Sequence, residues 1–215
     1  MKIKPLFYYS LFIFSLTAAL QPVPASAACE GKRMVVFGDS LVAGFGLPPG
    51  KAFPEQLSTK LAEGGYAIEV VNAGVSGDTT SGGLSRLEWS IGESADLVVL
   101  ELGGNDALRG IPVDLTRQNL EDMVVALKDK GTEIVLAGML APPNMGSKYG
   151  EAFNAIYPEL ASKHDITLYP FFLDGVAAES SLNLEDGIHP NTEGIGVMVE
   201  KILPVMKTKL QSICE

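Results

Sequence analysis

Histidine, cysteine and tryptophan are scarce in this chain of 215 residues, which contains two, two and one of them, respectively. With so few histidines and cysteines, and no His-Glu-x-x-His motif, the usual zinc hydrolase sites are excluded. The chain also lacks the Gly-x-Ser-x-Gly elbow of α/β-hydrolases, the P-loop lysine and the Gly-x-Gly-x-x-Gly dinucleotide fingerprint. These absences exclude several common hydrolase and nucleotide-dependent classes.

Positive charge is also in short supply. Lysine and arginine number 16 against 26 aspartates and glutamates, which gives a formal net charge of −10. Nucleic acids need a basic protein surface, so a nucleic-acid partner is not expected, and anionic membrane surfaces are disfavoured. Small neutral substrates remain compatible. The length and the 47% hydrophobic content predict one domain with a sizeable core.

No apolar run near the N-terminus is as long as a membrane-spanning helix requires. Leu6–Leu20 is almost wholly apolar but has only 15 residues, and it follows Lys2 and Lys4. Small residues at Ala25-Ser26-Ala27 are typical of a cleavage site, so residues 1–27 predict a Sec-type signal peptide. A retained anchor is the weaker alternative. We expect export to a bacterial periplasm or beyond.

The two cysteines lie at the two ends of the expected mature domain, residues 28–215, which has 14 basic and 26 acidic side chains and a charge of −12. In an exported protein, Cys29 and Cys214 favour a disulfide, since domain termini often lie close together. Two free thiols and a lipid-modified Cys29 are the alternatives. The bridge would close a loop of nearly the whole domain, worth about 4–5 kcal/mol in the chain-entropy model.

Short β-rich runs alternate with longer amphipathic stretches along the mature chain. Strands are expected at Arg33–Gly38, Ile68–Asn72, the apolar run Asp96–Leu102, Glu133–Gly138 and Ile166–Pro170. Helices are expected at Ala52–Glu63, Thr79–Ile91 with an interruption at Gly82-Gly83, Leu115–Lys130, Glu151–Lys163, and from a cap at Asn191 to about Ser212 with a kink at Pro204. This alternation predicts a single-domain, flavodoxin-like, three-layer α/β/α fold with a central parallel sheet of about five strands.

Polar turns follow several of the expected strands. They are Gly38-Asp39-Ser40, Ala73-Gly74-Val75 and Gly103-Gly104-Asn105-Asp106, while Asp186-Gly187-Ile188-His189 precedes the last helix. Sites in open α/β sheets form at the carboxyl ends of the strands. We therefore expect all four segments at the same edge of the sheet.

Ser40 and His189 are a candidate nucleophile and base. A serine nucleophile needs a base that titrates near neutral pH and a group that orients this base. Asp186, three residues before His189, could orient it. The other histidine, His164, is expected at a solvated helix end with Asp165 close by. Taken singly, Ser40 is as compatible with a helix cap, and the His189 segment with an ordinary loop.

Two further residues are candidate donors to a negatively charged oxygen. Acyl transfer builds charge on the former carbonyl oxygen, and one preorganised donor there is worth roughly 2.7–4 kcal/mol. Gly74 would let its backbone N–H approach a substrate closely, and Asn105 offers a neutral side-chain amide. Singly, each is also typical of a turn.

Four blocks occur in a fixed order: Gly-Asp-Ser-Leu, Asn-Ala-Gly-Val-Ser-Gly-Asp, Gly-Gly-Asn-Asp and Asp-Gly-Ile-His-Pro-Asn. Together they resemble the signature blocks of the SGNH, or GDSL, hydrolase family. The resemblance is to the thioesterase/protease/lysophospholipase and arylesterase branch. It extends to Leu102–Ile111, Ala152–Leu160 and Pro170–Leu173, and covers nearly all of the mature chain.

This resemblance implies a role for each candidate. Ser40 would be the nucleophile, and its own N–H, the Gly74 N–H and the Asn105 amide would form the oxyanion hole. His189 would act as base and then as acid, while Asp186 orients it. Neither a metal nor a cofactor is implied.

The implied activity is that of a secreted serine esterase. It would hydrolyse carboxylic ester and thioester bonds of short-to-medium acyl, aryl or lysophospholipid substrates through an acyl-enzyme on Ser40. Val75, Pro143 and Tyr149 follow strands and are candidates for contact with substrate, or part of a surface loop. A small-molecule partner, no stable membrane anchor and a monomer are expected. The alternatives are a carbohydrate or peptidoglycan O-deacetylase of the same family and a secreted binding protein.

Overall fold

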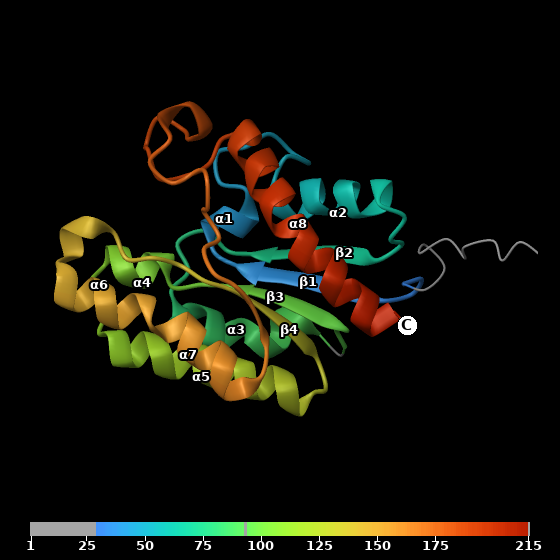
Figure 1. Ribbon diagram of the computed structural model, residues 1–215, viewed down its shortest axis with the longest axis horizontal. Coiled ribbons are helices and arrows are strands. Elements are labelled where there is room, and N and C mark those ends of the chain that lie inside the picture. Colours follow the sequence, from blue (N-terminus) through green and yellow to red (C-terminus); the bar gives the residue numbers. More distant parts are fainter. Residues whose placement is uncertain (1–28, 93, 215) are drawn as a thin grey trace, which may run out of the picture.

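The computed structural model describes residues 29–92 and 94–214, so the signal peptide expected at residues 1–27 lies outside the described residues. Five parallel strands form one sheet in the order β2-β1-β3-β4-β5 (Figure 1). Their bounds are β1 Arg33–Gly38, β2 Glu69–Gly74, β3 Leu97–Glu101, β4 Glu133–Ala137 and β5 Thr167–Tyr169. The predicted five-strand parallel sheet is confirmed.

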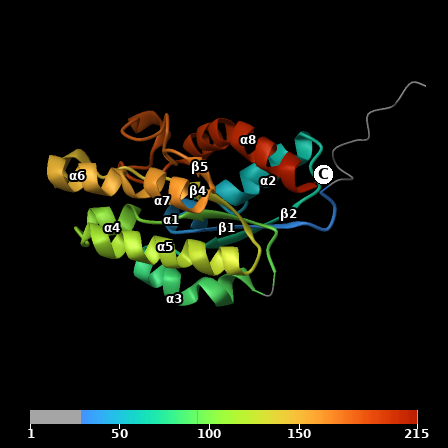
Figure 2. The ribbon, with the colours of Figure 1, turned by 60° about the horizontal axis from the view of Figure 1, so that its bottom comes forward.

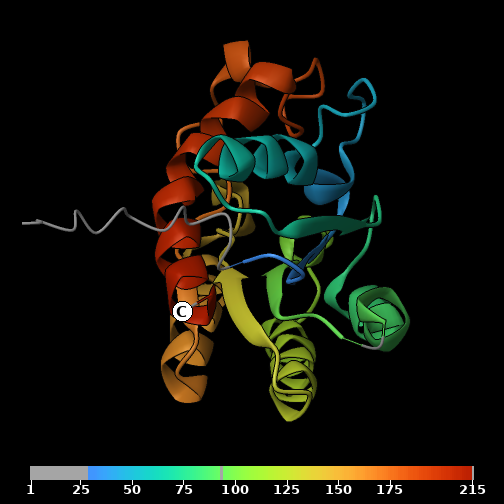
Figure 3. The ribbon, with the colours of Figure 1, turned by 90° about the vertical axis from the view of Figure 1, so that its right-hand side faces the viewer.

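Helices cover both faces of the sheet. Figures 2 and 3 show α2 and α8 on one side and α3 and α5 on the other, where α7 packs beside α5. The long helices are α2 Phe53–Glu63, α3 Thr80–Ile91, α5 Val113–Asp129, α7 Ile156–His164 and α8 Thr192–Cys214. The shorter ones are α1 Ser40–Ala43, α4 Gly104–Leu108, α6 Ser147–Asn154 and the 3₁₀ turns Pro143–Met145 and Ser180–Leu182.

The central strands are buried on both faces, which explains their nearly continuous apolar sequence. Every residue of β3 is buried, including the terminal Glu101. On α5 the buried face repeats at helical spacing through Leu120, Met123, Val124 and Leu127. A sheet sandwiched in this way needs apolar side chains pointing in both directions along each strand.

Two expected helices differ from the structure. The first, α3, runs without interruption through Gly82 and Gly83. A Cβ atom at Gly83 would lie 2.2 Å from Leu102 Cδ1, so this glycine permits close helix-to-sheet packing and does not break the helix.

The second is the helix expected over 151–163, which is two helices that meet at Ala155. Pro158 has no N–H to donate to the carbonyl group of Asn154, which removes one bond of the helical ladder at this point. The Asn154 side chain instead accepts a hydrogen bond from the backbone N–H of Ala141 at 2.9 Å. This contact ties the junction to the loop after β4.

Asn191 caps the last helix, as expected. Its Oδ1 atom accepts hydrogen bonds from the backbone N–H groups of Glu193 and Gly194, both at 3.0 Å. The helix then continues through Pro204 to Cys214. This cap fixes the point at which the loop carrying His189 joins α8.

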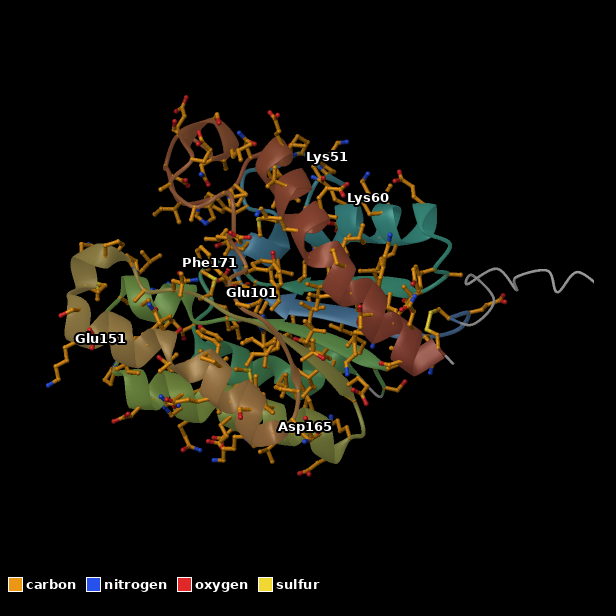
Figure 4. The ribbon with its side chains drawn as sticks, viewed as in Figure 1. Lys51, Lys60, Glu101, Glu151, Asp165 and Phe171 are labelled. Carbon is orange, nitrogen blue, oxygen red and sulfur yellow. A yellow bond between two sulfur atoms is a disulfide. The ribbon has the colours of Figure 1, made fainter. Side chains whose placement is uncertain are left out.

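A disulfide joins Cys29 to Cys214, whose Cα atoms are 5.0 Å apart. Figure 4 shows this bond at the end of the molecule where the chain enters β1 and leaves α8. A sulfur atom in a disulfide cannot also carry a lipid, so the pairing argues against the lipid-modified alternative for Cys29.

Candidate active site

The four segments of interest lie at the carboxyl edge of the sheet. Ser40 begins α1 directly after β1, Gly74 ends β2, Asn105 lies in α4 after β3, and His189 lies in the loop before α8 (Figure 1). The chain passes from β1 to β2 on one side and then to β3 on the other. Ser40 therefore stands at the switch point where open α/β sheets place their sites.

Ser40, His189 and Asp186 form a continuous chain of hydrogen bonds. Ser40 Oγ lies 2.8 Å from His189 Nε2, and His189 Nδ1 lies 2.7 Å from Asp186 Oδ2. A carboxylate only accepts hydrogen bonds, so Nδ1 carries the proton and Nε2 is free to accept the hydroxyl proton of Ser40. The imidazole is thus held in the tautomer that a general base requires.

The loop around Asp186 presents two backbone donors to its carboxylate. Asp186 Oδ1 accepts from the N–H groups of Ile188 at 2.9 Å and His189 at 3.0 Å. Gly187 makes this turn with a φ of +69°, a conformation that other residues rarely adopt. The bonds from the His189 and Ile188 N–H groups, with that from the His189 ring, lower the pKa of Asp186 to about 2.

Asp39 supports the serine from inside the protein. It is the N-cap of α1, where its Oδ1 accepts from the backbone N–H of Leu41 at 3.0 Å. Its Oδ2 accepts from Asn105 Nδ2 at 2.9 Å. Burial raises the pKa of Asp39, while the bonds from Leu41 and Asn105 act in the opposite direction. Asp39 therefore links the helix that carries Ser40 to the amide of Asn105.

Gly74 lies where two backbone segments approach closely. A Cβ atom at this position would lie 2.2 Å from the backbone nitrogen of Ala43 in α1, so only glycine fits. Its N–H donates to Asn72 Oδ1 at 3.0 Å. To donate to a substrate oxygen, this N–H has to share or exchange that partner.

Buried hydrogen bonds anchor α4, the short helix that carries Asn105. The next residue, Asp106, is fully buried and accepts from Thr80 N at 2.9 Å, Thr80 Oγ1 at 2.5 Å and Thr116 Oγ1 at 3.2 Å. These bonds connect α4 with α3 and α5. The position of Asn105 is thus set by two helices of the scaffold.

Comparison with family models finds a match over residues 36–195 to the GDSL-like lipase/acylhydrolase family. The chain belongs to this family. The resemblance seen in the four sequence blocks is thereby confirmed.

Characterised relatives are similar over most of their length. The chain is 38% identical to esterase TesA of Pseudomonas aeruginosa over 196 residues, 91% of this chain and 98% of that one. It is 39% identical to an arylesterase of Vibrio mimicus over 170 residues, 79% of this chain and 85% of that one. Identity to thioesterase 1/protease 1/lysophospholipase L1 of Escherichia coli is 38% over 167 residues, 77% and 79% of the two chains.

The fold is similar to that of solved members of the family. A crystal structure of TesA superposes with a TM-score of 0.79 at 39% identity, covering 82% of this chain and 99% of that one. Family and relatives agree that this GDSL-family protein is an ester hydrolase. The prediction of a hydrolytic enzyme is confirmed.

The three residues expected to contact substrate have different surroundings in this hydrolase. Val75 directly follows β2 and is 43% exposed at the carboxyl edge of the sheet. Tyr149 lies in α6, where its hydroxyl donates to the carbonyl of Ile111 at 2.9 Å. Pro143 lies in the 3₁₀ turn before α6. Tyr149 thus has a structural bond that ties α6 to the loop after α4.

Sequence reasoning missed Phe45, Arg86 and Glu101. The Phe45 ring lies 4.4 Å from the His189 ring, centroid to centroid. Arg86 donates to the carbonyl groups of Gly38 and Ala73 at the ends of β1 and β2, both at 2.9 Å. Nothing local to Phe45 or Arg86 signals these contacts. Glu101 did carry a signal, a carboxyl group inside an apolar strand.

His164 has a different partner from the one expected. Its Nε2 lies 3.1 Å from Glu121 Oε1 of α5, and its side chain is only 13% exposed. The expected helix end beside Asp165 is confirmed, since His164 is the last residue of α7 and Asp165 caps it. This end is less solvated than expected, because α7 packs against α5. His164 is a structural histidine on the far side of the sheet from α8.

Among the described residues, no group of histidine, cysteine or acidic side chains is arranged to hold a metal ion. In the same part of the chain, no helix combines the length and apolar character needed to cross a membrane.

Proposed function

We propose that this GDSL-family protein is a serine esterase that hydrolyses carboxylic ester and thioester bonds through an acyl-enzyme on Ser40. The observation that carries the proposal is the uninterrupted path from Ser40 Oγ through His189 to Asp186, with distances of 2.8 and 2.7 Å. A hydrogen-bonded nucleophile, base and orienting carboxylate is the arrangement that serine acyl transfer requires.

In the first half-reaction, His189 Nε2 takes the proton of Ser40 while the oxygen of Ser40 attacks the substrate carbonyl carbon. The charge that develops on the carbonyl oxygen is stabilised by the Ser40 N–H, the Gly74 N–H and Asn105 Nδ2. His189 then passes its proton to the leaving alcohol or thiol, and the acyl group stays on Ser40. Asp186 stabilises the imidazolium throughout.

In the second half-reaction, water takes the place of the alcohol. His189 removes a proton from the water, which attacks the acyl carbonyl carbon and releases the carboxylic acid. Ser40 recovers its proton from His189. The two half-reactions use the side chains and backbone donors at the sheet edge, the substrate and one water molecule.

The acyl group is proposed to be apolar and of short-to-medium length, or aryl. Apolar side chains that are unusually exposed surround the catalytic edge: Phe45, Val75, Leu108, Leu140 and Ile188. They come from the segments that follow β1, β2, β3 and β4 and from the loop of His189. Exposed apolar side chains on the segments around Ser40 favour an acyl or aryl ester, including a lysophospholipid, over a hydrophilic acetylated glycan.

Substitution of the nucleophile tests the mechanism. Ser40→Ala is expected to lower kcat for a p-nitrophenyl acyl ester by at least about 10⁴-fold, since the covalent route is lost. The matched control is Ser85→Ala, an exposed serine on α3, which should retain wild-type kinetics. Circular dichroism checks the fold of both. Near-normal hydrolysis by purified Ser40→Ala would rule the mechanism out.

A substrate series separates the proposed activity from its alternatives. Rates of the mature enzyme would be compared across acyl esters and thioesters of increasing chain length and across acetylated glycans. Preference for acetylated glycans would favour the O-deacetylase. A serine-reactive organophosphate that fails to label Ser40 would favour a binding protein.

Export is proposed from the composition of residues 1–27, together with the disulfide between Cys29 and Cys214, which is typical of oxidising compartments. We propose a monomer that acts in the periplasm or outside the cell. Mass spectrometry of the N-terminus after expression with the leader tests the expected cleavage after Ala27.

A further inference from the structure

Glu101 carries a carboxyl group that is buried in the centre of the molecule and has few hydrogen-bond partners. It ends β3 with 0% of its surface exposed, and Figure 4 shows it at the centre of the structure. Its Oε2 accepts one hydrogen bond, from the backbone N–H of Asp39 at 3.2 Å. Its Oε1 has no hydrogen-bond partner among the described residues. An ionised carboxylate so poorly solvated is strongly disfavoured.

A second buried carboxyl group, that of Asp39, lies beside it. Asp39 has two donors of its own, the Leu41 N–H at 3.0 Å and Asn105 Nδ2 at 2.9 Å. Two adjacent buried carboxyl groups cannot both ionise without a cation. Because Asp39 has more donors than Glu101, the negative charge belongs on Asp39 and the proton on Glu101.

The charged and titratable groups around the pair leave this assignment intact. Burial raises the pKa of Asp39, but the charge of His189 acts to lower it, which favours the charge on that residue. The nearby Tyr157 hydroxyl donates to the carbonyl of Leu102 at 2.9 Å, and the charge of Asp106 contributes, after burial, to raising its pKa. Arg86, from α3, bonds to Asp78, Ser90 and two backbone carbonyls. Among the described residues, none of the ion pairs includes Glu101.

We propose that Glu101 is a positioning residue that keeps one proton on the buried Glu101–Asp39 pair, so that Asp39 alone carries charge and orients the Asn105 amide for the reaction. Burial, followed by the charge of Asp39, raises the pKa of Glu101 well above its ordinary value, which is consistent with the geometry. One N–H of Asn105 Nδ2 donates to Asp39, and the other remains available for the substrate oxygen.

The proton on Glu101 matters because negative charge develops on the substrate oxygen near Asn105 during catalysis. A second negative charge behind Asn105 would oppose the charge that develops on the substrate oxygen. It would also repel Asp39 and disturb its bond to Asn105. A neutral Glu101 avoids both effects while its Oε2 still holds the Asp39 backbone N–H directly before the nucleophile.

The inference rests on the proposed roles of Ser40 and Asn105, but its first test does not depend on turnover. A carboxyl group that stays protonated when folded and ionises when unfolded releases a proton on unfolding, so its contribution lowers the free energy of unfolding as pH rises above its ordinary pKa of 4.5. Urea unfolding of wild type, Glu101→Gln and Glu151→Gln would be compared from about pH 5 to 8.

We expect wild type to release one more proton on unfolding than Glu101→Gln over this range. Glu151, an exposed glutamate on α6 far from Glu101 in Figure 4, is the matched control, and Glu151→Gln should follow wild type. Equal slopes for wild type and Glu101→Gln would overturn the inference.

A measurement without variants is the ¹³C spectrum of glutamate-labelled protein at pH 7, where one side-chain carboxyl should resonate as protonated. A spectrum with every glutamate ionised would also overturn it.

Kinetics test the link to Asn105. Glu101→Ala is expected to lower kcat about 10- to 100-fold with little change in KM, since one oxyanion donor is misplaced. Glu101→Gln, which remains neutral and can still accept the Asp39 backbone N–H through its amide oxygen, should recover most of this loss. In an Asn105→Ala background, Glu101→Ala should cost less than threefold further.

If Glu101→Ala lowers kcat by the same factor in the Asn105→Ala background as in the wild type, Glu101 acts independently of Asn105 and the proposal is overturned. Failure of the proposed function is separate, because it would appear as activity in Ser40→Ala while the proton count on unfolding stays the same.

Discussion

The bond between Asp186 and His189 shows how one short loop orients the imidazole of the proposed base. Asp186 uses one oxygen for two backbone N–H groups of its own loop and the other for the imidazole ring. The backbone bonds fix the carboxylate in place, and the carboxylate in turn fixes the ring and its tautomer. Phe45 covers the ring from the side of α1, with 48% of its own surface exposed.

Asp186→Asn tests this preparation of the base. The amide keeps the shape of the side chain but can favour the wrong imidazole tautomer, so kcat is expected to fall by about 10²- to 10⁴-fold. KM should change little, because Asp186 does not contact the substrate. Steady-state kinetics on an acyl ester measure both values. A variant with more than a third of wild-type kcat would contradict the assigned role.

The lowered pKa of Asp186 also predicts a change of stability with pH. A carboxyl group whose folded pKa, about 2, lies below its ordinary 3.8 stabilises the fold above pH 3.8 and loses this contribution as the pH falls toward 2. The stability difference between wild type and Asp186→Asn should therefore be constant above pH 3.8 and shrink below it. Because Asp186 is largely solvated, the effect is small, and urea unfolding at several pH values measures it. A difference that grows toward low pH would contradict the assignment.

Among the secondary-structure elements, α3 holds together the strand ends that carry the site. The Arg86 guanidinium donates to Gly38 O of β1, Ala73 O of β2 and the Asp78 carboxylate, and lies 4.0 Å over the Phe37 ring. Ser40 and Gly74 follow these carbonyls closely in sequence. One planar side chain thus sets the spacing between two elements of the proposed oxyanion hole.

Arg86→Lys is expected to destabilise the protein by about 1–3 kcal/mol, since a lysine cannot reproduce the planar fork that serves the Gly38 and Ala73 carbonyl groups and the Asp78 carboxylate together. It should also lower kcat, because Ser40 and Gly74 lose their common support. The matched control is Arg117→Lys, whose partner Glu159 is exposed, and which should change stability by less than about 1 kcal/mol. Equal effects of the two changes in thermal unfolding would refute the assignment.

For the molecule as a whole, the Cys29–Cys214 disulfide and the edge that carries Ser40 lie at opposite ends of the sheet. The disulfide joins residues 185 apart in sequence, next to the start of β1. Ser40 lies after the end of the same strand. The disulfide can therefore restrict the unfolded chain without changing the arrangement of the residues around Ser40.

The double variant Cys29→Ser/Cys214→Ser is expected to lose up to about 4–5 kcal/mol of stability, because the unfolded chain regains the entropy of a long open loop. For a domain of this size, Tm should fall by on the order of 10 °C. Hydrolysis at 25 °C should stay near wild type. Differential scanning calorimetry measures the shift, which the wild type should reproduce under reducing conditions. An unchanged Tm would contradict the expected role of the bond.

The boundaries that sequence predicted well are those set by local patterns. Arg33–Gly38 was predicted with its bounds, and the cap at Asn191 was recognised from residue type alone. The split at Ala155 and the unbroken α3 were not predicted. The unbroken α3 depends on a contact with another element, the packing of Gly83 on Leu102. The split at Ala155 combines a local cause, the missing N–H of Pro158, with the bond between Asn154 and the loop after β4.

By itself the sequence determined the alternation of strands and helices, the family and the identity of the candidate residues, because periodicity and the four blocks are local properties. Only the tertiary structure decided how these residues meet. Ser40 and His189 are 149 residues apart and share a hydrogen bond of 2.8 Å. The Gly74 N–H has Asn72 as its partner, and Glu101 faces Asp39 away from water. These contacts depend on which distant segments pack together. The burial of Glu101 that results from this packing is what keeps its carboxyl group protonated.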